Sequence, residues 1–106
     1  MPKYLLKASY TSAGVKGVAA DGGSSRVEAV SAAADSVGGS LEAFYFAFGD
    51  ADAYVIADLP DNEAATAVAL TVNASGRASI ETVALITPEE VDAAAKREVS
   101  FRPAGG

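Results

Sequence analysis

The sequence predicts an α+β fold in which two β-α-β units are joined by a hairpin and followed by a C-terminal helix. Segments 3–11, 52–59 and 78–86 alternate between two faces with the period of a strand, and 41–48 is dense in aromatic residues. Segments with helical spacing lie between them. Half of the 106 residues are apolar, which is enough for one domain with its own core.

The first predicted unit runs from the N-terminal strand to a pair of glycines. One face of that strand carries Tyr4, Leu6, Ala8 and Tyr10, and the other carries Lys3, Leu5, Lys7 and Ser9. Helical spacing covers Ser12 to Ala20, and the glycines within 21–23 interrupt it. A better helix follows over 24–37, where Ser25 and Glu28 fit a capping box. Its apolar stripe consists of Val27, Val30, Ala34 and Val37.

The second predicted unit begins with a hairpin. Strands over 41–48 and 52–59 flank a turn at Gly49 and Asp50. Asp61 follows Pro60 and is placed as the N-cap of a helix that Gly76 ends. The strand over 78–86 then leads to the C-terminal helix, 87–97. That helix has strong start signals in the cap Thr87, Pro88 and Glu90.

This order is the ferredoxin-like arrangement, a four-stranded antiparallel sheet with both long helices on one face. We expect a single domain over residues 1–106, with an ordered core of about 2–98 and a frayed tail over 99–106. Many alanines and few aromatic residues predict a core of small side chains with closely spaced elements.

Composition excludes several kinds of chemistry. There is no cysteine and no histidine, so disulfides, thiolate catalysis and the commonest general base and metal ligand are absent. We expect no metal site and no cofactor. The net charge is −6 without a basic run, which argues against nucleic acid as a partner. Lysines break up the N-terminal apolar residues, so we expect no signal peptide, no membrane span and a cytoplasmic protein.

The stretch "GDADAYVIADLPD", residues 49–61, resembles the signature of the GYD-domain family. The signature is Gly-x-Tyr-Asp, an apolar run, Glu-x-Pro-Asp and a helix. The matching residues are Gly49, Asp52, Pro60 and Asp61. Asp58 replaces the glutamate, and Ala51 stands where the family has its tyrosine. The resemblance to this family extends over roughly residues 2–92. The resemblance implies a ferredoxin-like domain of the dimeric α+β barrel type, and it implies neither a settled activity nor established catalytic residues.

The acidic residues around the third strand have different predicted roles. Asp50 and Asp61 are interpreted as turn and cap residues, and a structural role is also favoured for Asp52. Asp58 falls on the sheet face opposite the helices, where a charged group must be paired or solvated. Antiparallel pairing of the first and third strands would bring Lys3 or Lys7 to it.

These residues define a candidate site on the helix-free face. The candidate pocket consists of Lys7, Phe44, Phe46, Tyr54, Asp58 and Glu81. The same face is expected to carry Lys3 and Phe48. One interpretation is a set of cross-strand ion pairs at a dimer seam, and the other is the polar end of an apolar pocket.

Two functions remain open. The first is a homo-oligomer with a small-molecule pocket between sheets, which would bind a small apolar ligand or catalyse a cofactor-free reaction. The alternative is a structural or regulatory oligomerisation module without enzymatic activity. In both, the expected partner is a second copy of the chain.

Overall fold

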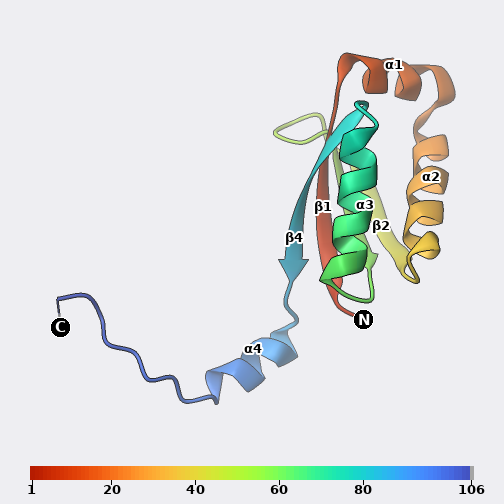
Figure 1. Cartoon of the computed structure of the whole chain (residues 1–106). Coiled ribbons are helices and arrows are strands. Elements are labelled where there is room, and N and C mark those ends of the chain that lie inside the picture. The colour runs from red at the N-terminus through yellow and green to blue at the C-terminus, as the bar shows by residue number, and fades with distance from the viewer. Residues whose placement is uncertain (106) are drawn as a thin grey trace.

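The sheet is built around the N-terminal strand. The structure, a computed structural model, describes residues 1–105. The strands are β1 (Lys3–Tyr10), β2 (Ser40–Phe46), β3 (Ala53–Asp58) and β4 (Ala78–Leu85). All neighbours pair antiparallel in the order β2-β3-β1-β4, so β1 lies between β3 and β4. The ferredoxin-like α+β prediction is therefore confirmed (Figure 1).

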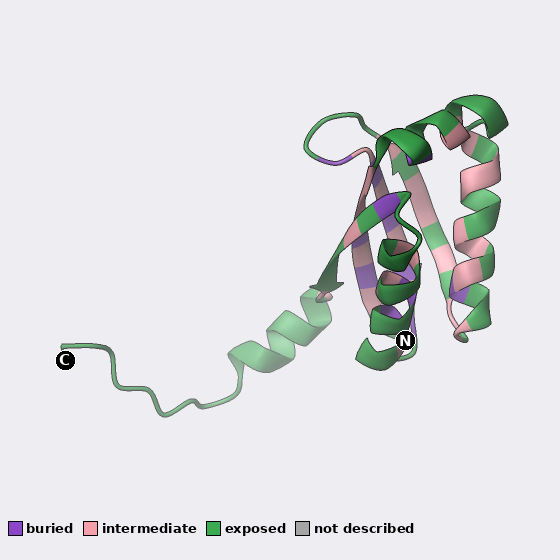
Figure 2. Cartoon of the chain, turned by 45° about the horizontal axis from the view of Figure 1, so that its top comes forward, coloured by how far each residue is buried: buried purple, intermediate pink, exposed green. Residues whose placement is uncertain are grey.

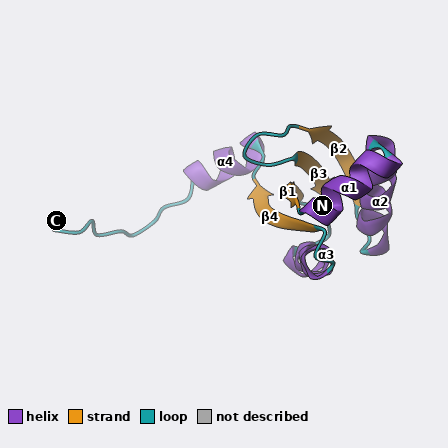
Figure 3. Cartoon of the chain, turned by 90° about the horizontal axis from the view of Figure 1, so that it is seen from above, coloured by secondary structure: helices purple, strands orange, loops and turns teal. Residues whose placement is uncertain are grey.

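Two helices, α2 (Gly23–Ser36) and α3 (Asn62–Ala74), cover one face of this sheet, and α1 (Ser12–Asp21) lies across its end on the same side (Figure 1). Seen from above, they lie on one side of the sheet, and α4 (Pro88–Ala95) leads away from it (Figure 3). The opposite side of the sheet, which we call the open face, is not covered by these helices. Among residues 1–105, no helix is long and apolar enough to span a bilayer.

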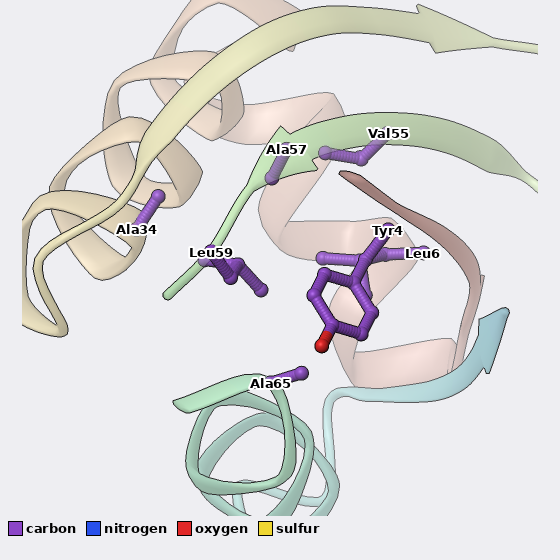
Figure 4. Packing of buried hydrophobic residues seen from close by; sticks show 7 residues of the cluster. All are labelled: Tyr4, Leu6, Ala34, Val55, Ala57, Leu59 and Ala65. Atoms are coloured by element: carbon purple, nitrogen blue, oxygen red, sulfur yellow. The ribbon is translucent and has the colours of Figure 1, made fainter. Parts of the chain in front are cut away.

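The core lies between the helices and the covered face. Its buried cluster consists of Tyr4, Leu6, Ala34, Val55, Ala57, Leu59 and Ala65 (Figure 4). Alternation along β1 and β3 sends these side chains inward, as predicted. The Tyr4 hydroxyl donates to Asn62 Oδ1 over 2.6 Å at the start of α3, so its polar end is satisfied.

Most predicted helix caps are confirmed. Asp61 accepts from the Ala64 amide over 2.9 Å, and Thr87 and Glu90 form a complete capping box. The predicted box at Ser25 and Glu28 is wrong. α2 already begins at Gly23, before these two residues. The single residue Gly22 joins α1 to α2, and as a glycine it can adopt the required φ of 82°.

The apolar stripe of α2 is narrower than predicted. Ala34 is buried, and Val30 and Val37 pack against the core. Val27 is 36% exposed, so its expected place in the stripe is wrong.

Both hairpin strands are shorter at the loop than predicted, and β3 begins at Ala53 rather than at residue 52. β2 stops at Phe46 rather than Phe48, which has a φ of 60° and cannot continue a strand. The loop is closed by the Ala47 amide, which donates to the Asp52 carbonyl over 2.9 Å. The Asp52 carboxylate accepts from the Tyr10 amide over 2.8 Å, so this acid is structural, as predicted.

A bulge near the start of β2 changes which face its side chains occupy. Leu41 pairs with Ala57, and the next paired residue is Ala43, which pairs with Ile56, so Glu42 is an extra residue. After a bulge, alternation resumes with the opposite phase. Phe44 therefore pairs with Val55, and Phe46 with Ala53, on the covered face.

α4 makes a separate C-terminal arm. It ends at Ala95 rather than residue 97. Every described residue from 88 onward is exposed, and the arm leads away from the sheet (Figure 2).

Gly14 allows α1 to lie directly on the chain before β4. The Thr11 amide and hydroxyl both donate to the Arg77 carbonyl, over 3.0 and 3.2 Å. A Cβ at Gly14 would collide with the same carbonyl oxygen. This contact fixes the start of α1 against the end of the sheet.

We therefore expect Gly14→Ala to lower the free energy of unfolding by about 1–3 kcal/mol, because backbone must move to admit a methyl group. Gly17→Ala in the same helix is the matched control, since its Cβ would meet nothing within 4 Å. The control should gain up to about 1 kcal/mol from helix propensity. Urea denaturation measures both, and equal effects would contradict the close approach of α1 to Arg77.

Candidate functional site

The open face has an apolar row at its centre. Leu5 of β1 lies between Ile56 of β3 and Val83 of β4, and Ala43 of β2 extends the row beyond Ile56. All four point away from the helices because they alternate with residues of the covered face. None of them is fully buried in the protomer. The centre of the open face is thus apolar and accessible.

A charged cluster lies on one side of this row. Lys3 Nζ donates to Asp58 Oδ1 over 2.9 Å and to Glu42 Oε1 over 2.7 Å. The hydrogen bond to Glu42 and then that to Asp58 raise the pKa of Lys3 above its ordinary value. This contribution to stability is therefore complete below the pKa of an unfolded lysine and is lost as the pH rises through the folded pKa. Near neutral pH the cluster is fully formed.

A second polar group lies on the other side of the row. Lys7 is paired across the strands with Tyr54 on β3 and Glu81 on β4. Its Nζ is 3.9 Å from Glu81 Oε2, which makes a loose ion pair, and the Glu81 side chain is largely in solvent. On β2, Tyr45 pairs with Tyr54 and extends this second polar group across the sheet.

A recess of about 240 Å³ opens beside Lys7. Its lining includes Lys7, Ser9, Asp50, Ala51, Ser79 and Glu81. Ala51 is only 3% exposed, although it belongs to the hairpin loop. The alanine that stands in place of the family tyrosine therefore lies at the wall of this recess.

The six predicted pocket residues do not all share one site. Lys7, Tyr54 and Glu81 are neighbours, and Asp58 lies on the same face but is paired with Lys3, not Lys7. Placing Phe44 and Phe46 on the open face is wrong, because the bulge at Glu42 turns both to the covered face.

Phe48 does not join the open-face site either. Its ring stacks on Phe46 with centroids 6.0 Å apart.

Sequence reasoning missed several residues of the site. Ser9 and Ser79 line the recess because they occupy the same cross-strand row. Their alternation with Ala8 and Ile80 is a signal that could have revealed them. Alternation with the predicted positions of Phe44 and Phe46 would also have placed Glu42 on the open face, where it pairs with Lys3.

The lining of the recess carries polar groups of several kinds. Lys7 supplies a cation, the two serines supply hydroxyl groups, and Glu81 and Asp50 supply carboxylate acceptors. Tyr54 places a phenol beside Lys7. In the isolated protomer the recess is open, so a second surface is needed to exclude water from it.

One family model matches the chain. It is described as the GYD domain and covers residues 4–95, from β1 to the end of α4. Neither the curated proteins nor the solved structures include a significant match.

The two charged groups of the open face should behave independently. Asp58→Asn and Lys3→Met are expected to be coupled in a double-mutant cycle, whereas Asp58→Asn and Lys7→Met should be additive. Each single change should lower Tm by less than about 6 °C, because both pairs are partly exposed. Thermal melts at low and high salt measure this. Coupling of Asp58 to Lys7 would contradict the observed pairing.

Proposed function

The chain belongs to the GYD-domain family, and we propose that it is a homo-oligomer, at least a dimer, that binds a small molecule between sheets packed face to face. In this arrangement the open faces of two copies meet and the helices lie outside. This is the dimeric α+β barrel arrangement.

The apolar row of the open face carries the proposal. Leu5, Ile56 and Val83 form a continuous apolar stripe across three strands, and Leu85 adds to it beside Lys3. Such stripes on an uncovered sheet favour association, because burying them removes apolar surface from water. A stable pair would bury on the order of 1,600 Å² in total. A two-fold axis would place the same residues on both sides of the interface.

The recess beside Lys7 is the proposed binding site. A second sheet would cover its mouth and so strengthen its polar contacts. Because Phe44 and Phe46 face the helices, the ligand that suits this recess is small and polar rather than apolar. A cofactor-free reaction on that ligand is an extension of the proposal. No disulfide is needed for the fold, and the cytoplasm is the proposed compartment.

The second candidate is an oligomerisation module without a ligand. This module is favoured because Phe44 and Phe46 face the helices, so the open face lacks the aromatic lining expected for a pocket. A fragment screen by NMR distinguishes the two. Hits that shift the amides of Lys7, Ser79 and Glu81 support the binding site, whereas an interface without such hits supports the module.

Assembly can be tested with one charge placed in the apolar row. Ile56→Lys should convert the oligomer to monomer at micromolar concentration, because a lysine in the centre of the interface would be buried without a partner. Sedimentation equilibrium measures the mass.

The matched control is Leu70→Lys on α3, which removes an apolar side chain that is 66% exposed on the helix side. It should leave the oligomer intact. A wild-type protein that sediments as a monomer at micromolar concentration would contradict the proposal.

A further inference from the structure

A cleft runs between α2 and α3 on the covered side of the sheet. Its inner part is a narrow apolar cavity of about 50 Å³. Val30 and Ala33 of α2 form one wall, and Val68 and Val72 of α3 form the other. Its floor consists of sheet residues that include Leu6, Phe44 and Val55. The small and β-branched side chains of the two helices leave this space unfilled.

The cleft widens into a mouth beneath α1. This outer cavity has a volume of about 320 Å³ and is lined by α1, the C-terminal end of α3 and the start of β4. The inner and outer cavities share Tyr10, Arg26, Val72 and Ala78 in their linings, so they lie directly beside each other. The outer volume is at the lower end of the range of small-molecule sites, about 300–1,000 Å³.

Close backbone contacts hold the mouth open. The hydrogen bonds of Thr11 and the missing side chain of Gly14 fix α1 on Arg77. At the other end of α1, a Cβ on Gly23 would come within 2.9 Å of the Phe46 ring. The corner between α1 and α2 therefore rests on an aromatic ring, and neither contact leaves α1 free to collapse into the space.

Two arginines line the outer cavity. Arg26 of α2 is half-buried and also lines the inner cavity, whereas Arg77, before β4, is exposed and lines only the mouth. Neither side chain makes an ion pair or hydrogen bond to another residue within 1–105. Asp21 also lines the mouth, but it does not pair with either of them in the described chain. The mouth therefore has a net positive charge in a protein whose overall charge is −6.

We propose that this cleft binds a small amphiphilic carboxylate. The apolar body of the ligand lies between α2 and α3, and its carboxylate is held by Arg26 and Arg77 in the mouth. Guanidinium groups match the planar carboxylate with paired hydrogen bonds, and Tyr10 contributes a further side chain to the mouth. The cleft belongs to one protomer and lies on the side away from the open face, so this site is independent of the proposed oligomer.

Octanoate is the probe that tests the proposal. Titration calorimetry and ¹⁵N–¹H spectra of the full chain should show saturable binding, with shifts at the amides of Val30, Val68 and Val72. Hexanoate should bind about tenfold more weakly, because two methylene groups leave the apolar cavity. Octanol should bind more weakly than octanoate, because it lacks the charge.

Variants separate the two halves of the site. Arg26→Gln and Arg77→Gln should each weaken octanoate binding at least about tenfold and leave octanol binding unchanged. Gly17→Leu should weaken binding of both, since it fills the mouth from a position with open space around its Cβ. Its folding is favoured by the better helix propensity of leucine. Lys96→Gln, which removes a cation beyond α4, is the matched control and should bind like wild type.

Three results would overturn the proposal. The first is the absence of saturable octanoate binding to the wild-type chain. The second is binding that both arginine variants leave unchanged. The third is a set of shifts confined to Lys7, Ser79 and Glu81, which would assign the ligand to the open face instead.

Discussion

The register of β1 against β3 and β4 decides which side chains reach the core and which reach the open face. β1 is paired on both edges, and its alternation divides the molecule into a covered face with Tyr4 and Leu6 and an open face with Lys3, Leu5 and Lys7. A slip of one residue would exchange these two sets. The register against β3 is fixed at both ends, by the Pro2 carbonyl that accepts from the Leu59 amide and by the Asp52 carboxylate that accepts from the Tyr10 amide.

Features that depend on local chemistry could be predicted from the sequence. The alternation of β1, β3 and β4 and the caps at Asp61 and Thr87 follow from spacing and residue type. Strand pairing leaves Lys3 or Lys7 as the partner of Asp58, and the structure has Lys3 in that place. The bulge at Glu42 could not be predicted in this way. Strict alternation would put Glu42 on the same face as Phe44. The bulge separates the two side chains, so that the half-buried Phe44 faces the helices and Glu42 pairs with Lys3.

The space between α2 and α3 could not be predicted from the sequence either. Many alanines predicted closely spaced elements, yet α2 and α3 leave a space between them. The contacts that position α1 and α2 join residues far apart in sequence, where Gly23 meets Phe46 and Gly14 meets Arg77. Composition gives the size of the side chains but not the distance between the helices that carry them. The two faces of one sheet thus offer different chemistry, a polar recess with a hydrophobic row on one and an apolar cleft with a cationic mouth on the other.

In the proposed oligomer two copies bring their open faces together, and a distance between helices on different copies tests this claim. The chain has no cysteine, so Thr66→Cys on the exposed side of α3 accepts a single spin label per protomer. Sheets packed face to face place both helix layers outside. With layers roughly 10 Å apart, double electron–electron resonance should give a label separation of more than about 30 Å. A separation below about 20 Å, as expected when helices of two copies pack about 8–10 Å apart, would contradict the claim, and so would the absence of any intermolecular distance.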